Sequence, residues 1–347
     1  MSINHLLIAI SIFNITGSLA QNANIDENYV NYHKKINRAE TLFFMKDEVD
    51  SALTLYDEVF KKYDFIFVKD FVNAAQIAHF SHKPYKKYIK KGFKFGLKLE
   101  HLKNYPLFKY DLAELRNDKA LQQTYALKRK DYLKNIDFNY LDWIYDLFIK
   151  DQFDKSKPDY EDIISISLKL IKSKIEQKGF PGERVLGIGD SIIFAEHGIP
   201  QLDLKEQIKK YGEELWYVET EDKALSQTKI FVLLVHHHSA YIEMKKVLWK
   251  QMKKGNIHPR DIGLVFDNMY RFSNGRFAPF NDDPPKNRVF FRLNLFTDYP
   301  EKTIKNVKTT NALRKSFNIV PLAVDNKKKE LEKKYGFVLF SGYWDCR

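Results

Sequence analysis

Three consecutive histidines, His236, His237 and His238, are the residues of this chain best suited to chemistry. They follow the apolar run of residues 231–235, which is too hydrophobic to be left in water, so the imidazoles should emerge at the edge of a core. Histidine changes charge near neutral pH, and it can move protons or bind metals. Successive side chains of a helix point ~100° apart, so at most two of the three rings can share a site.

General acid–base catalysis by His237 is one hypothesis for this stretch. A carboxylate beside an imidazole fixes its tautomer, and we expect Asp151 or its neighbour Gln152 to orient the ring. The other binding groups expected at the site, among them an arginine for an anionic substrate, are His236, His238, Arg271 and Asn274. The alternative is structural: the histidines pack at a helix end and bond to the nearby backbone.

A metal site is a less favoured interpretation of the three histidines. Metal ligands within one helix are best placed four residues apart, and Ala240 and Tyr241 occupy those positions here. Glu243 follows His236 by two helical turns, ~10 Å along the axis, which is too far to share an ion. The single cysteine, Cys346, can form neither a cysteine-rich metal site nor an internal disulfide. We therefore expect no metal and no cofactor.

A glycine-rich block at residues 187–191 could suggest a phosphate-binding loop. It lacks the Lys-Ser/Thr pair of nucleotide-binding loops, and the dinucleotide-binding spacing is absent as well. The block contains Gly-Asp-Ser, as some esterases do, but no Asp-x-x-His follows near the end of the chain. We expect Ser191 to be an ordinary loop residue.

Composition limits the class of protein. The chain has 347 residues, of which 44% are hydrophobic and 15% aromatic. This length and composition are enough for one large or two medium hydrophobic cores and are not those of a disordered protein. The excess of 57 Lys+Arg over 45 Asp+Glu gives a formal net charge of +12. The basic residues are spread along the whole length, and no nucleic-acid recognition motif is present. We expect no specific nucleic-acid partner.

The first 20 residues form a segment of their own. Residues 6–13 are apolar with no charged residue before or among them, and Ser18 and Ala20 supply the small residues of a cleavage site. This pattern indicates a signal peptide cut after Ala20, and therefore an exported protein, periplasmic or secreted. No later apolar run is long enough for a bilayer, so we expect no transmembrane segment in the mature chain.

The rest of the chain divides into two predicted parts after a polar lead-in at residues 21–38. Residues 39–105 are predicted to form consecutive helices with alanines and large aromatics at recurring places, similar to a tetratricopeptide-type hairpin. A plain helical bundle is the alternative. We expect this helical region to recruit a protein partner. Residues 106–347 are predicted to be a mainly helical domain of unknown function.

Helix signals are clearest in the second part. One predicted helix runs from Asp137 to Gln152, and a second follows Asp159, carries an apolar stripe and stops at Gly179. A third is capped by Ser239. Further helices are expected at residues 258–270, 303–317 and 327–334, and short strands at 289–293 and 337–340. The predicted fold class is mainly α, with helical hairpins or a bundle and a small β element in the C-terminal part.

These residues together resemble an uncharacterised bacterial family, a domain of unknown function. The resemblance covers roughly residues 137–325, and its motifs here are Asp151-Gln152, Gly179-Phe-Pro-Gly182, Val235-His-His-His-Ser239, His258-Pro259, Asn274-Gly275, Arg314 and Ile319-Val-Pro-Leu322. It places the family's motif histidine at His237 and the family's glutamine at His236. Ser239 stands where the family has aspartate, and its Tyr-Gly-Thr-Gln segment does not follow Gly275. A catalytic family would therefore have an altered or inactive member here.

Two classes of function follow from these patterns. In the first, which we prefer narrowly, an exported binding or scaffold protein holds its ligand in a polar, histidine-lined pocket. In the second, the C-terminal domain is a hydrolase-like enzyme that uses His237 as general acid or base. A pocket in which His237, Asp151 and an arginine converge would favour the enzyme, whereas a sealed His237 would favour the binding role.

Overall fold

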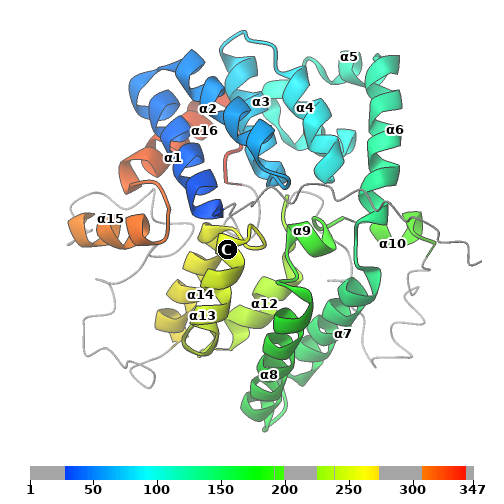
Figure 1. Cartoon of the computed structure of the whole chain (residues 1–347), viewed down its shortest axis with the longest axis vertical. Helices are drawn as coiled ribbons and strands as arrows, with labels where there is room; N and C mark the ends of the chain where they lie inside the picture. Colours follow the sequence, from blue (N-terminus) through cyan, green and yellow to red (C-terminus); the bar gives the residue numbers. More distant parts are fainter. Residues whose placement is uncertain (1–27, 191, 199–224, 238, 273–306, 341–347) are drawn as a thin grey trace, which may run out of the picture.

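The computed structural model describes residues 28–190, 192–198, 225–237, 239–272 and 307–340. Within these ranges the chain is mainly helical, so the mainly α fold class is confirmed (Figure 1). The first helices are α1 (Tyr29–Lys46), α2 (Val49–Lys62), α3 (Val68–Phe80), α4 (Lys86–Gly92), α5 (Leu112–Asn117) and α6 (Lys119–Lys134), with short 3-10 turns η1 (Phe93–Phe95), η2 (Leu99–Asn104) and η3 (Pro106–Phe108) after α4. The later helices are α7 (Phe138–Asp154), α8 (Tyr160–Lys178), α9 (Glu183–Leu186), α10 (Ile193–Glu196), α12 (Lys229–His236), α13 (Ala240–Lys253), α14 (Pro259–Phe272), α15 (Val307–Ser316) and α16 (Leu322–Tyr335).

Two hydrophobic cores organise these helices. The first lies among α1 to α5, and residues 320–340 from the far end of the chain complete it. Figure 1 shows α16, in red, beside the blue helices α1 and α2, and α16 packs against α1. The second core lies among α7, α8, α12, α13 and α14 in the lower half of the same view. The chain therefore returns at its end to the core with which it began.

Helix α1 begins at Tyr29, well inside the predicted polar lead-in at residues 21–38. Its buried side chains Tyr29, Tyr32, His33 and Ile36 follow the spacing of one helical face. Three of these four side chains carry a polar atom, so in the sequence the buried face of α1 looks like part of a polar segment. Asn28 caps the helix through its side chain, which accepts a hydrogen bond from the backbone N–H of Val30.

The predicted edge strand at residues 337–340 is wrong, because in the described residues this segment pairs with no other strand. Three of its four apolar side chains are buried, but polar side chains of other elements, not a neighbouring strand, bond to its backbone. Gln76 bonds both polar groups of Val338, accepting from its N–H at 2.8 Å and donating to its carbonyl at 2.9 Å. Glu332 accepts from the N–H of Leu339. The strand predicted at 289–293 lies outside the described residues.

The local start and stop signals in the second part act largely as expected. Asp137 caps α7 by accepting from the N–H of Tyr140, and Gly179 ends α8 with a φ of +90° that L side chains rarely adopt. Ser239 occupies the N-cap position of α13, but its side chain makes no capping hydrogen bond. The Ser239 hydroxyl donates to the Glu243 carboxylate instead.

Tyr132, at the end of α6, lies where the two cores meet and packs between two glycines. A Cβ added to Gly96 would come within 2.6 Å of its ring, and one added to Gly187 within 2.1 Å of its hydroxyl. Both glycines have positive φ, and the Tyr132 hydroxyl accepts from the N–H of Ile188 at 2.9 Å. Part of the glycine-rich block at residues 187–191 is thus a packing surface for an aromatic ring.

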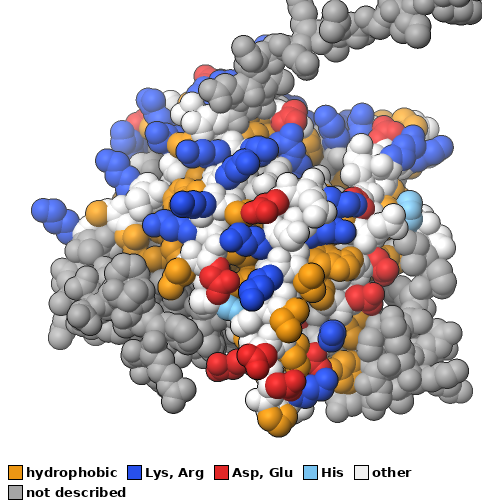
Figure 2. Space-filling view, turned by 60° about the horizontal axis from the view of Figure 1, so that its bottom comes forward, with side chains coloured by type: hydrophobic (Ala, Val, Ile, Leu, Met, Phe, Trp, Pro, Cys, Tyr) orange, Lys and Arg blue, Asp and Glu red, His pale blue; other side chains and the backbone are white. Residues whose placement is uncertain are grey.

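Several predictions concern residues that the structure does not describe, namely the signal peptide at 1–20, Ser191, His238, Asn274 and Cys346. Within the described ranges, no helix combines the length and apolarity needed to cross a bilayer. Lys and Arg side chains are numerous over the upper and middle parts of the face in Figure 2, whereas acidic side chains gather near its lower edge.

Candidate functional site

Helices α7 and α12 pack against each other and bring one predicted carboxylate to one predicted imidazole. Asp151 lies in the last turn of α7, and His236 is the final residue of α12. Nδ1 of His236 lies 2.7 Å from Oδ2 of Asp151. The Asp151 side chain is 5% exposed and that of His236 is 24% exposed. The pair therefore combines a buried carboxylate with a ring that solvent can reach.

Three donors hold the Asp151 carboxylate in place. The Tyr160 hydroxyl, at the start of α8, donates to Oδ1 at 2.8 Å, and the Gln152 amide donates to Oδ2 at 2.8 Å. His236 supplies the third bond through Nδ1. Gln152 is itself held by Lys155, whose ammonium donates to the amide oxygen at 2.6 Å. A carboxylate with these contacts selects the tautomer of His236 that has hydrogen on Nδ1 and leaves Nε2 as an acceptor when neutral.

His237 lies away from Asp151, between two serines. Its Nε2 is 3.3 Å from Oγ of Ser165 on α8, and its Nδ1 is 3.0 Å from Oγ of Ser239. Ser165 already donates its hydrogen to the carbonyl of Glu161, and Ser239 donates to Glu243. Each serine oxygen can therefore accept a hydrogen bond from a ring nitrogen that carries a hydrogen. His237 is 8% exposed, which leaves little room for a substrate.

The predicted site residues are thus only partly brought together. Asp151, Gln152 and His236 converge, whereas His237 faces another set of partners. Arg271 belongs to α14, but its side chain, like His238 and Asn274, lies outside what the structure describes. The sequence analysis missed Tyr160 and Ser165, both on α8. No short-range sequence pattern predicts their contacts, because these contacts depend on how α8 crosses α7 and α12.

No group of three or more His, Cys, Asp or Glu side chains within the described ranges is arranged to hold a metal ion. His258 is buried beside α1, with its ring centroid 5.0 Å from that of His33. Burial lowers the pKa of His258 well below the usual value, so the neutral ring is the stable form there.

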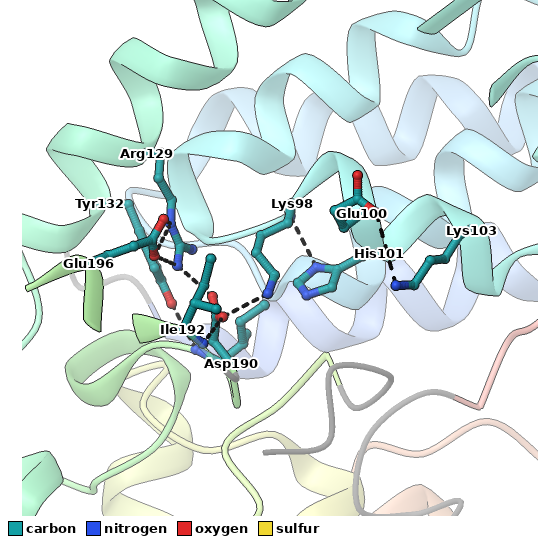
Figure 3. Close-up of polar contacts among 10 residues, drawn as sticks. Lys98, Glu100, His101, Lys103, Arg129, Tyr132, Asp190, Ile192 and Glu196 are labelled. Carbon is teal, nitrogen blue, oxygen red and sulfur yellow. Dashed lines mark hydrogen bonds and ion pairs between the residues drawn. The ribbon is translucent and has the colours of Figure 1, made fainter. Parts of the chain in front are cut away.

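A second polar cluster surrounds Asp190 of the glycine-rich block (Figure 3). Asp190 is fully buried and accepts from the Lys98 ammonium at 2.7 Å and from Nη2 of Arg129 at 2.5 Å. Burial alone would raise its pKa, but the Arg129 charge and the Lys98 hydrogen bond hold the pKa of Asp190 below its usual value. Arg129 also donates to Glu196 on α10. Because the charged side chains are paired and mostly buried, this cluster joins elements and offers no reactive group.

A third cluster of ionisable groups lies between α1, α3, α14 and α16. It surrounds an enclosed cavity of about 20 Å³, room for roughly one water molecule. The Tyr32 hydroxyl donates to Asp70 at 2.5 Å, and burial raises the pKa of Asp70 to about 6 against the opposing effects of Tyr32 and Lys69. Burial and the Lys69 charge lower the pKa of His33 to about 3. The cavity is too small for a substrate.

No family model, curated protein or solved structure matches this chain. The resemblance to the uncharacterised bacterial family and to tetratricopeptide hairpins therefore stays a prediction. Function has to be argued from the geometry of the described residues.

Proposed function

We propose that this chain is an exported binding protein whose recognition group is the His236 imidazole. The observation that carries the proposal is the anchoring of Asp151 by three donors, because it orients the ring and sets its tautomer at no further cost when a ligand arrives. Nε2 of the neutral ring would accept a hydrogen bond from a hydroxyl or ammonium group of the ligand. Export is supported by the apolar residues 6–13 and the small residues before position 21.

The burial of His237 supports this binding role over a hydrolase that uses His237 as its base. A second candidate function is acid–base catalysis by His236. The Asp151–His236 contact favours it, since an imidazole oriented by a carboxylate is the usual arrangement of a general base. The two functions differ in one observable: a catalyst converts its ligand, whereas a binding protein returns it unchanged.

The test uses two replacements of His236. His236→Gln keeps an amide that can still donate to Asp151, so the local structure should survive without the imidazole. His236→Ala removes both the imidazole and the hydrogen-bond donor to Asp151. His82→Asn is the matched control, because His82 is exposed, remote from α12, and has a φ of +56° that asparagine tolerates. A thermal-shift screen of the parent against small polar molecules, run with all three variants, identifies ligands that depend on the ring.

We expect hits whose stabilisation is retained in His82→Asn and lost in both His236 variants. Mass spectrometry of each hit after incubation then separates binding from turnover. Urea unfolding supplies a second readout that needs no ligand. His236→Gln should unfold within about 1 kcal/mol of the parent, whereas His237→Ala should lose about 2 kcal/mol or more, because its ring is buried and hydrogen-bonded. A loss in His236→Gln as large as that in His237→Ala would make His236 a structural residue and end the proposal.

A further inference from the structure

A ridge of lysines runs along the exposed side of α13. Lys246, Lys250 and Lys254 follow at four-residue intervals, and Lys253 lies beside them. All four are exposed, and in the described part of the chain none pairs with a carboxylate. On a helix this spacing places the three ridge lysines on nearly one face, ~6 Å apart along the axis. Four positive charges are thus concentrated on about two turns.

Grooves lie on both sides of this ridge. The larger, of about 990 Å³, is lined on its far side by Tyr29, Asp64 and Arg184. The smaller, of about 650 Å³, lies between α13 and the end of α8. Lys246, Lys250, Lys254 and Asn256 line both. Ligand-binding pockets of proteins have volumes of roughly 300 to 1,000 Å³, and both grooves are within this range.

The turn at residues 179–182, the Gly-Phe-Pro-Gly motif of the sequence, packs against the end of α13, and its Gly179 lines the smaller groove. Gln251 of α13 accepts from the N–H of Phe180 at 3.2 Å and from the Asn256 amide at 2.6 Å. A Cβ added to Gly182 would lie 2.5 Å from the carbonyl oxygen of Asn256. The motif therefore allows close approach of the two turns, and the groove walls are held by hydrogen bonds rather than by lysine side chains.

The other charges along the grooves are largely neutralised within the protein. Arg184 pairs with Asp64, and Lys178 lies 2.6 Å from Asp137. Glu176 lines the smaller groove. A helix C-terminus attracts cations, but its partial charge is only about half an elementary charge and does not account for four lysines. A positive excess remains on the ridge, and its electrostatic field would attract an anionic partner.

We propose that the ridge and its two grooves bind an extended acidic segment of a partner protein. Alternate side chains of an extended chain lie on one face, ~6.6 Å apart, which is close to the ~6 Å step of the ridge lysines. Acidic residues at every second position would therefore each reach one lysine. The side chains between them would point away from the ridge, and the backbone of the segment would lie against the larger groove, where the partly exposed Trp249 offers an apolar surface. A hollowed surface fits a chain better than a flat membrane.

The experiment measures binding of two fluorescein-labelled peptides to the full chain by anisotropy. In the first peptide four glutamates alternate with serines; in the second the same four glutamates are consecutive. The test variant changes Lys246, Lys250 and Lys254 to glutamine, a good helix former. The matched control changes Lys119, Lys128 and Lys130 to glutamine, which removes the same charge from exposed positions of α6. Circular dichroism verifies that both variants keep the helicity of the parent.

We expect the alternating peptide to bind more tightly than the consecutive one, and to bind more weakly as salt increases. The α13 variant should lose about tenfold or more in affinity, and the α6 variant about twofold or less. Equal losses in the two variants would reduce the effect to net charge and overturn the proposal. Equal affinities of the two peptides would contradict the proposed match between alternate acidic residues and the spacing of the ridge lysines. A single-stranded oligothymidylate that binds tighter than either peptide, and depends on α13, would replace the acidic protein with a nucleic acid.

Discussion

Replacing Asp70 with asparagine should stabilise the protein progressively as the pH rises. Asp70 is buried, accepts a hydrogen bond from Tyr32 and faces Glu40, Lys69 and Lys328. Burial raises its pKa from 3.8 to about 6, so the folded state prefers the protonated acid. Ionised Asp70 therefore costs stability, and this cost is fully present above pH 6 and absent below pH 3.8.

The pKa rise corresponds to about 3 kcal/mol at high pH, because one pKa unit is worth about 1.4 kcal/mol. Asparagine is a neutral analogue of the protonated acid and can still accept from Tyr32. The difference in unfolding free energy between Asp70→Asn and the parent should thus change by about 3 kcal/mol in favour of the variant, mostly between pH 4 and pH 7.

Urea unfolding at half-unit pH intervals measures this difference directly. Contributions from other groups, including His33 and His258, cancel when the variant is compared with the parent at the same pH. Asp50→Asn is the matched control, since the Asp50 side chain is 82% exposed and its pair with Lys83 lies at the surface, where it contributes little. A difference between Asp70→Asn and the parent that is flat with pH, or that falls as pH rises, would show that burial does not govern the ionisation of Asp70.

Two further predictions concern the junction of the two cores. Gly187→Ala should lower the free energy of unfolding in urea by about 2 kcal/mol more than Gly198→Ala does. Both glycines have positive φ, but only the Cβ added at Gly187 would meet Tyr132. Equal losses in the two variants would contradict the packing argument. Asp190→Ala should lose about 3 to 5 kcal/mol of unfolding free energy, because Lys98 and Arg129 would stay buried without their shared carboxylate. A loss under about 1 kcal/mol would mean that water solvates these two cations in the variant.

The helices themselves could largely be predicted from the sequence, because their signals are local. The apolar stripe of α8 and its glycine stop, and the Asp137 cap of α7, each depend on residues within one or two turns. The same reasoning missed the start of α1, where tyrosines and a histidine provide the buried face. It also assigned a strand to residues 337–340. This segment is largely buried, but its backbone partners are the side chains of Gln76 and Glu332.

The candidate site shows the same division at the scale of one residue. The sequence analysis placed His237 beside Asp151 or Gln152, whereas His236 is the histidine that contacts Asp151. Which histidine meets Asp151 depends on the crossing of α7 and α12, since adjacent helical residues point ~100° apart. Tyr160 joins the same carboxylate only because α8 folds back beside α7.

The sequence by itself determined most of the helices and the apolar faces that each must bury, because periodicity is a property of neighbouring residues. Only the tertiary structure decided that residues 320–340 complete the core of α1 to α5 and that His236 rather than His237 contacts Asp151. The physical reason is that hydrophobic burial is not directional: an apolar face specifies that it must be covered, but not which face covers it. That choice depends on the packing of the whole chain.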